Sequence, residues 1–275
     1  MGIDSIAFLG AGNMAEAFCR GLIQGRVVDR ERIFLSDLRP AGQIAWAAEA
    51  GLKVAASNLE AVDRASVVVL SVKPKDVDGV LDGLAAASPE ESLESKTFLS
   101  IAAGVPLARL EAGLKGRRVP VVRVMPNTPA LVGRGASAFC LGTHAGGEQA
   151  GAARAVLQAV GIAFEVKEAQ MDAVTALSGS GPAYVFLFME ALQAAGEKLG
   201  LEAETCFQLA AQTLAGASEM IQRRTDSPAR LREKVTSPGG TTAAALKAFE
   251  EGGFKPLVEK ALRAARDRGV ELGKS

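Results

Sequence analysis

The stretch Ser5-Ile6-Ala7-Phe8-Leu9-Gly10-Ala11-Gly12-Asn13-Met14-Ala15 decides the fold. Its apolar start predicts a β-strand and the residues from Asn13 onward predict a helix, so two glycines stand at a βα junction. The pattern G-x-G-x-x-G/A at such a junction is typical of a dinucleotide-binding unit, in which the backbone approaches a pyrophosphate at the helix N-terminus. A glycine turn that binds nothing is the alternative. Because the motif lies at the first βα junction, we favour dinucleotide binding over this alternative. The expected cofactor contacts are Gly10, Gly12, Asn13 and Met14.

Downstream of this motif, short β-type runs alternate with Ala-rich helical stretches. Several runs are apolar at consecutive positions, as in Val67-Val68-Val69-Leu70, which is typical of strands covered by helices on both faces. The alternation predicts an α/β fold with βαβ units around a parallel sheet. We therefore predict a Rossmann-type dinucleotide-binding domain over residues 1–166, with strands at residues 5–9, 32–35, 67–72, 97–101, 119–125, 136–141 and 162–166.

The chain after residue 166 lacks a β pattern and consists of long helical stretches. Pro182 fits the first turn of a helix, and Gly200 fits a helix end. Residues 184–189 are apolar on more than one helix face, which is more than a small helical domain buries alone, so we expect a partner subunit to cover them. We predict an all-helical dimerisation domain over residues 167–275, with helices at residues 182–200, 203–224, 228–235, 241–251 and 255–269.

The charge balance narrows the range of partners. The 275 residues contain 31 Lys+Arg and 31 Asp+Glu, so no basic surplus is present to neutralise a nucleic-acid backbone, and no nucleic-acid partner is expected. The longest uncharged run, residues 173–189, is shorter than the ~20 apolar residues of a membrane span and is interrupted by glycine and proline. No basic stretch precedes the first strand, as a signal peptide would require. We expect a cytoplasmic protein that does not enter the membrane.

Cysteine and histidine are scarce. The three cysteines, Cys19, Cys140 and Cys206, are far apart in the sequence, and His144 is the one histidine. These counts argue against a Cys/His zinc site, so no metal is expected. The cysteines have apolar neighbours, which predicts reduced, structural thiols. His144 stands in a glycine-rich segment typical of a solvated loop, so a histidine base is not expected.

The end of the second predicted strand bears on the choice of nicotinamide cofactor. It reads Leu35-Ser36-Asp37-Leu38-Arg39. An acid at this position accepts a hydrogen bond from the adenosine ribose of NAD, whereas an arginine pairs with the 2′-phosphate of NADP. Asp37 therefore favours NAD, while Ser36 and Arg39 favour NADP. All three are candidate cofactor contacts, and the choice between the cofactors stays open.

Three further segments follow predicted strands, where an open α/β sheet has its ligand crevice. They are Ser71-Val72-Lys73-Pro74, residues 100–104 and Met125-Pro126-Asn127-Thr128-Pro129. Taken singly, Lys73 fits a surface charge and the two prolines fit a rigid turn. Three such segments at one edge of the sheet favour a crevice.

The helical half contains a loop that is rich in hydroxyls and glycine. Val235-Thr236-Ser237-Pro238-Gly239-Gly240-Thr241-Thr242 runs directly into the strong helix former Ala243-Ala244-Ala245-Leu246. Free backbone N–H groups at a helix start, joined by hydroxyls, make an anion site sized for a carboxylate. A plain capping loop is the alternative, but it needs only one Ser or Thr.

The sequence closely resembles the Δ1-pyrroline-5-carboxylate reductase family over nearly the whole chain. The resemblance rests on Val72-Lys73-Pro74, on Arg123-Val124-Met125-Pro126-Asn127-Thr128-Pro129 and on the residues around Gly10 and Gly12. Two further segments are highly specific: the run from Asp172 to Tyr184, which contains Leu177-Ser178-Gly179-Ser180-Gly181-Pro182, and the loop from Val235 to Thr242.

The resemblance implies reduction of the cyclic imine 1-pyrroline-5-carboxylate to L-proline, the last step of proline biosynthesis. It implies NADPH, the common preference, or NADH as cofactor, and a helical domain that interlocks with a second subunit in a homodimer, often within a decamer. The resemblance implies that Asn58, Lys73, Pro74, Asn127 and Thr128 lie near the cofactor, and Val72 and Met125 in the same segments are further candidate cofactor contacts. Residues at substrate-binding positions are Ser237, Gly240, Thr241 and Thr242, of which Ser237 and Thr242 are the catalytic candidates.

Two other functions are consistent with the first motif alone. A β-hydroxyacid dehydrogenase also begins with a Gly-x-Gly-Asn-Met turn, but needs a lysine just after its own Gly-Ser-Gly helix start, and here the first lysine after Pro182 is Lys198. A non-catalytic dinucleotide sensor has no use for a carboxylate loop. The loop from Ser237 to Thr242 therefore favours the reductase.

Overall fold

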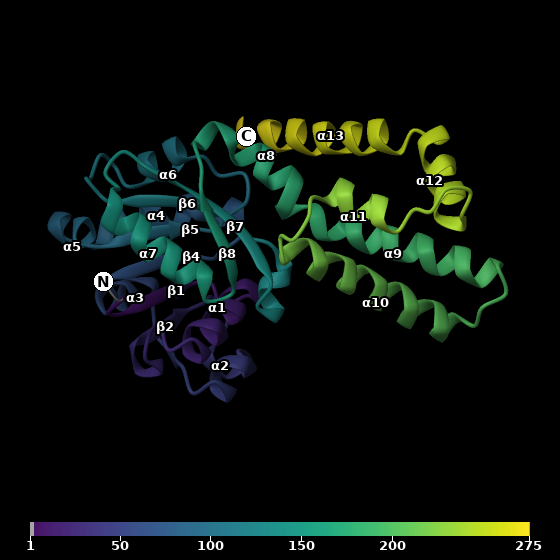
Figure 1. The fold of residues 1–275 in the computed structure, drawn as a ribbon. Coiled ribbons are helices and arrows are strands. Elements are labelled where there is room, and N and C mark those ends of the chain that lie inside the picture. Colours follow the sequence, from purple (N-terminus) through teal and green to yellow (C-terminus); the bar gives the residue numbers. More distant parts are fainter. Residues whose placement is uncertain (1–2, 275) are drawn as a thin grey trace. The chain divides into compact units, whose positions relative to one another are not determined.

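The computed structural model describes residues 3–274 and contains two compact units (Figure 1). The first unit runs to Ser180 and includes the residues from Ala265 onward, and the second is Gly181–Ala264. This division differs from the one expected at residue 166. Met171 explains the difference, because its side chain is buried in the core of the first unit and so attaches the segment after residue 166 to the sheet.

The first unit is built on one eight-stranded sheet with the order β3-β2-β1-β4-β5-β6-β7-β8. All neighbouring strands are parallel except β6 and β7, which are antiparallel. The sheet is therefore the expected Rossmann-type sheet with one reversal near its edge. The strands are β1 (Ile6–Leu9), β2 (Ile33–Ser36), β3 (Lys53–Val54), β4 (Val67–Leu70), β5 (Thr97–Ser100), β6 (Val121–Met125), β7 (Gly135–Leu141) and β8 (Gly161–Glu165).

Both faces of the sheet are covered. Ile6 and Phe8 of β1 belong to one buried cluster, and Ala7 and Leu9 belong to the other, as expected where successive side chains point to opposite faces. Helices α1 and α7 contribute to the first cluster, and α3, α4 and α6 contribute to the second. The α-helices of this unit before residue 181 are α1 (Asn13–Gln24), α2 (Ala45–Glu49), α3 (Asn58–Asp63), α4 (Val77–Ala87), α5 (Glu90–Glu94), α6 (Leu107–Gly113), α7 (Gly147–Gln158) and α8 (Met171–Val174).

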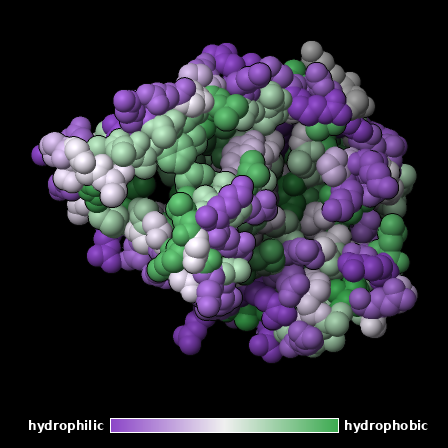
Figure 2. Space-filling view, turned by 90° about the vertical axis from the view of Figure 1, so that its right-hand side faces the viewer, coloured by the Kyte–Doolittle hydropathy of each residue, from purple (hydrophilic) through white to green (hydrophobic). Residues whose placement is uncertain are grey.

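The second unit is helical, as predicted. Its helices are α9 (Gly181–Lys198), α10 (Ala203–Gln222), α11 (Pro228–Lys234), α12 (Thr241–Glu251) and the first part of α13 (Phe254–Lys274). Helix α9 has no buried residue, and Val185, Phe186 and Leu187 are each more than half exposed. Figure 2 shows hydrophobic residues (green) at the surface among hydrophilic ones (purple). The apolar excess expected from the sequence is therefore present in this unit.

The helices also bear on whether the chain enters a membrane. Within residues 3–274, none of them is both long and apolar enough to cross a bilayer.

Candidate cofactor and substrate sites

The two glycines of the first motif have different structural tasks. Gly10 has φ of 102° and donates its N–H to the carbonyl of Ser36 at 2.7 Å, and a Cβ on it would lie 2.7 Å from the backbone oxygen of Ser71. Gly10 is therefore required by the fold itself. A Cβ on Gly12 would meet nothing within 4 Å, and Gly12 caps α1 without a side-chain hydrogen bond. Open space beside free helix N–H groups fits the pyrophosphate of a dinucleotide.

Asp37 and Arg39 form a network behind this turn. The carboxylate of Asp37 accepts hydrogen bonds from the backbone N–H groups of Ala11 at 2.8 Å and Arg39 at 2.9 Å. It also accepts from the Arg39 guanidinium, through Nε at 2.9 Å and Nη2 at 3.0 Å. The hydrogen bonds from Arg39 are the main cause that lowers the pKa of Asp37 to about 2. Ser36, by contrast, is buried at the end of β2.

The segment after β4 lies beside the glycine turn. Ser71 Oγ donates to the carbonyls of Leu9 at 3.1 Å and Gly10 at 2.6 Å, so the end of β4 is tied to the first motif. Val72 is partly buried, whereas Lys73 and Pro74 are exposed. Because β1, β2 and β4 are parallel neighbours, the segments that follow them share one edge of the sheet.

Asn58 opens α3, whose cap is the neighbouring Ser57. Ser57 Oγ accepts from the N–H of Glu60 at 3.1 Å. The side chain of Asn58 is therefore not needed to cap its own helix. Its cofactor contact stays a prediction.

Asn127 is held by protein groups on both sides of its amide. Its Nδ2 donates to the carbonyl of Ser178 at 3.0 Å, and its Oδ1 accepts from the N–H of Ala136 at 2.9 Å. Ser178 lies in a π-helical turn, Thr175–Gly179, a geometry often found at functional sites. Asn127 therefore joins the loop after β6 to this turn, a positioning task that its sequence context alone did not reveal.

Met125 and Thr128 flank Asn127 in different environments. Met125 is partly buried, and its Cε lies 2.3 Å from the position that a Cβ on Gly179 would take. Glycine at 179 thus allows the π-helical turn to approach the end of β6. Thr128 is exposed and begins a short 3-10 helix, Thr128–Val132. Thr128 is therefore accessible to a ligand.

A buried charge lies on β6 just before this loop and was not singled out in the sequence. Arg123 is 6% exposed on β6, and its guanidinium lies 3.3 Å from Glu168 and 3.6 Å from Asp172. Glu168 also accepts from the N–H of Leu107 at 2.6 Å. A buried charge requires such partners. The sequence feature that could have indicated this buried charge is an arginine inside the apolar run 121–125.

The hydroxyl-rich loop of the helical unit leads into a helix start without a side-chain cap. Gly240 caps α12, and no side-chain oxygen accepts a hydrogen bond there. Its own N–H donates to the carbonyl of Ser237 at 3.0 Å, and Gly239 has φ of 69°. Ser237 and Thr241 are exposed and Thr242 is partly buried. The hydroxyls are therefore not used as caps, in contrast to the alternative of a plain capping loop.

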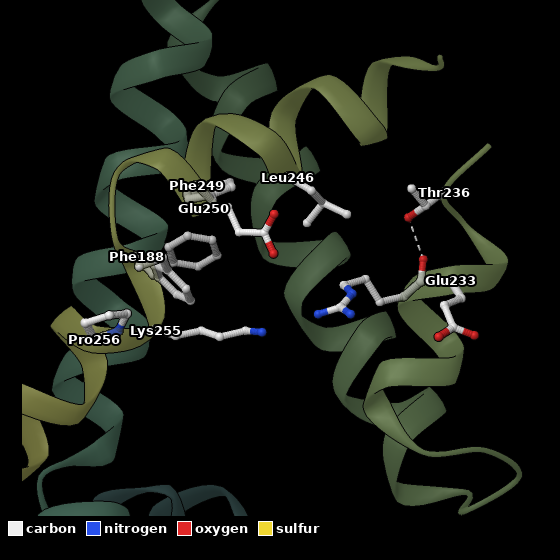
Figure 3. Close-up of a pocket in the computed structure, with 10 residues that line it drawn as sticks. Phe188, Glu233, Thr236, Leu246, Phe249, Glu250, Lys255 and Pro256 are labelled. Carbon is white, nitrogen blue, oxygen red and sulfur yellow. Dashed lines mark hydrogen bonds between the residues drawn. The ribbon is translucent and has the colours of Figure 1, made fainter. Parts of the chain in front are cut away.

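A cavity of about 600 Å³ lies next to this loop within the helical unit (Figure 3). Thr236, which precedes Ser237 in the loop, lines it, and Thr236 Oγ1 donates to the carbonyl of Arg232 at 2.6 Å. Three phenylalanines supply an apolar wall, with ring centroids 6.5 Å apart for Phe188 and Phe249 and 5.5 Å apart for Phe249 and Phe254. This cavity could not be predicted from the sequence, because its residues come from separate helices.

The cysteines are free and buried, as predicted for structural thiols. Burial is the main cause that raises the pKa of Cys19, and it raises the pKa of Cys140 to about 12. His144 is exposed between β7 and α7. Within residues 3–274, no group of three or more His, Cys, Asp or Glu side chains is placed to hold a metal ion.

Known proteins share both parts of this arrangement. Residues 168–272 match the family model "pyrroline-5-carboxylate reductase dimerisation", and residues 5–104 match "NADP oxidoreductase coenzyme F420-dependent". A pyrroline-5-carboxylate reductase of Pseudomonas aeruginosa is 49% identical over 273 residues, which are 99% of this chain and 98% of that protein. One of Mycobacterium tuberculosis is 39% identical, with 98% of this chain and 97% of that protein covered.

Solved structures agree with these sequence matches. A pyrroline-5-carboxylate reductase of Coxiella burnetii has a TM-score of 0.91 and 38% identity, with 99% of this chain and 100% of that chain covered. A pyrroline carboxylate reductase of Plasmodium falciparum, solved with NADP bound, has a TM-score of 0.85 and 32% identity, with 98% of each chain covered. This chain belongs to the pyrroline-5-carboxylate reductase family.

Proposed function

We propose that this protein reduces 1-pyrroline-5-carboxylate to L-proline, the last step of proline biosynthesis, in the cytoplasm. The observation that carries the proposal is the loop from Ser237 to Thr242, which offers hydroxyls and the N–H groups of a helix start that no side chain caps. Such a site suits the carboxylate of the substrate. Family membership supports the same reaction.

The cofactor contacts that we propose lie in the first unit. Gly10, Gly12, Asn13 and Met14 form the turn and helix start that receive the pyrophosphate, with Asp37 and Arg39 behind it. The nicotinamide cofactor, NADPH or NADH, supplies the hydride when bound. The further cofactor contacts that we propose are Ser36, Asn58, Val72, Lys73, Pro74, Met125, Asn127 and Thr128.

The substrate contacts that we propose lie in the hydroxyl-rich loop. Ser237, Gly240 and Thr241 hold the carboxylate, and Thr242 donates a hydrogen bond to the ring nitrogen or accepts one from it, according to its protonation. An imine nitrogen can be protonated before hydride arrives, so the site does not need a strong protein acid. This is consistent with a chain whose one histidine is exposed in a turn.

Product analysis tests the proposal. The purified protein is incubated with pyrroline-5-carboxylate and NADPH or NADH, and the product is separated by chiral chromatography. L-proline in an amount equal to the nicotinamide oxidised is the expected result. Nicotinamide oxidation without proline would contradict the assignment of the substrate.

We expect the protein to be at least a dimer, and we propose a decamer built from dimers as the larger form. Phe186 and Leu187 are 62% and 65% exposed on α9, and Leu209 is 57% exposed on α10. Apolar side chains in such number are typical of a subunit interface, and residues 168–272 match a dimerisation family model. Light scattering at micromolar protein concentration measures the mass directly. A monomer with full activity would contradict this expectation.

A further inference from the structure

The adenosine end of the proposed cofactor site contains a charged pair, Asp37 and Arg39, that is closed by several hydrogen bonds. Asp37 Oδ1 accepts from the N–H and the Nε of Arg39, and Oδ2 accepts from the N–H of Ala11 and from Arg39 Nη2. A carboxylate has about four acceptor positions, so the protein already occupies all of them. The Asp37 side chain is 13% exposed, whereas that of Arg39 is 48% exposed.

The N–H groups of Arg39 that would bind a phosphate best already donate to protein acceptors. A guanidinium binds carboxylates or phosphates through two parallel N–H groups on one edge. In Arg39 the edge formed by Nε and Nη2 faces Asp37, and Nη2 also donates to the carbonyl of Ala11 at 2.9 Å. Only Nη1 has no hydrogen bond within residues 3–274. A phosphate must therefore either accept hydrogen bonds from Nη1 alone or displace the Arg39 guanidinium from Asp37.

The charge of Asp37 also opposes a phosphate directly. The hydrogen bonds from Arg39 are the main cause that lowers the pKa of this carboxyl to about 2, so it stays ionised near neutral pH. A ribose 2′-hydroxyl carries no charge and leaves the pair intact. A 2′-phosphate carries a double negative charge and meets a pair whose positive member is already neutralised.

We propose that the closed Asp37–Arg39 pair selects against the 2′-phosphate, so that NAD(H) binds this protein at least as tightly as NADP(H). The inference rests on the proposed function, because it concerns the cofactor choice of the same site. It assigns a specificity-determining role to two side chains and does not depend on the imine.

The protein carries its own reporter for this choice. Trp46 is the one tryptophan in the chain, and its Nε1 donates to the carbonyl of Ala11 at 3.2 Å. This carbonyl also accepts from Arg39 Nη2. Trp46 fluorescence therefore reports on the glycine turn and on the charged pair together, and it measures binding without catalysis.

The experiment is a titration of Trp46 fluorescence with NAD+ and with NADP+, in the wild-type protein and in Asp37→Asn. The amide oxygen introduced at position 37 can still accept from the Ala11 N–H, but the neutral amide no longer offsets the charge of Arg39. We expect NADP+ affinity to rise about three- to tenfold and NAD+ affinity to stay within about twofold. Asp29→Asn is the matched control, because it removes one exposed carboxylate just before the 3-10 helix at residues 30–32 and is expected to leave both affinities unchanged.

Arg39→Gln keeps the proposal testable if Asp37→Asn does not fold. It leaves Asp37 charged and without its cation, so NADP+ affinity is expected to fall about three- to tenfold while NAD+ affinity stays within about twofold. Equal changes for the two nucleotides would overturn the proposal, as would a wild-type protein that binds NADP+ more tightly than NAD+. Loss of proline formation with the expected binding ratios would instead contradict the proposed function alone.

Discussion

Replacement of Gly12 by valine is expected to weaken the binding of NAD(H) and NADP(H) by at least about tenfold, or ~1.4 kcal/mol, while the protein stays folded. Gly12 has extended backbone angles that valine adopts readily, and a Cβ there meets no protein atom within 4 Å. The added side chain would fill the open space beside the helix N–H groups, where the pyrophosphate is expected. The measurement is a nucleotide titration followed by Trp46 fluorescence.

Two control variants separate this loss from a folding defect. Gly147→Val places the same side chain at the exposed start of α7, where a Cβ also meets nothing within 4 Å, and it is expected to leave nucleotide affinity unchanged. Gly10→Ala is expected to lower the melting temperature, because its Cβ would collide with the backbone of Ser71 at a positive φ. Normal nucleotide affinity in folded Gly12→Val would remove the glycine turn from the cofactor site.

Replacement of Thr242 by alanine is expected to lower kcat/KM for the imine by about five- to 150-fold, or ~1–3 kcal/mol in transition-state terms. The reason is the loss of one hydrogen bond to the ring nitrogen in a desolvated site. Nucleotide affinity is expected to stay the same. Steady-state kinetics measure kcat/KM for the wild-type protein and the variant, and melting temperatures show whether both are equally stable.

Ser237→Ala is expected to differ from Thr242→Ala. A carboxylate anchor acts in the ground state as well as in the transition state, so its loss mainly raises the KM for the imine. Because α12 is capped by Gly240 without a side-chain hydrogen bond, neither variant is expected to lose the ~1 kcal/mol that a capping hydroxyl contributes. Thr205→Ala, in the first turn of α10, is the matched control. Normal turnover in Thr242→Ala would contradict the proposed hydrogen bond between Thr242 and the ring nitrogen of the substrate.

The main elements were predictable because their signals are local. Apolar runs such as Val67-Val68-Val69-Leu70 and the periodic stretch 203–224 are consistent with β4 and α10 within a few residues. Strand β3, Lys53–Val54, was not predicted because two residues carry no pattern. The antiparallel direction of β7 was also missed, because it follows from pairing with β6 and not from the composition of residues 136–141.

In the site too, the features set by neighbouring residues could be predicted from the sequence, whereas contacts between residues far apart in the chain could not. The turn at Gly10 and Gly12 could be predicted from its spacing, since the glycines act through their own backbone. The partner of Asn127 lies 51 residues away, at Ser178, and the sequence near Asn127 contains no sign of it. The pairing of Arg39 with Asp37 is close in sequence, but the contacts that both side chains make with Ala11 depend on how β2 lies beside β1.

Nicotinamide absorbance at the start of the reaction tests the central claim most directly. Purified protein is mixed with pyrroline-5-carboxylate and either NADPH or NADH, and the decrease in absorbance is followed, with a β-hydroxyacid and the oxidised cofactor as the control reaction. We expect oxidation of the reduced cofactor that depends on the imine and that Thr242→Ala slows, with no reaction in the control. No imine-dependent oxidation by the folded, nucleotide-binding protein would contradict the account.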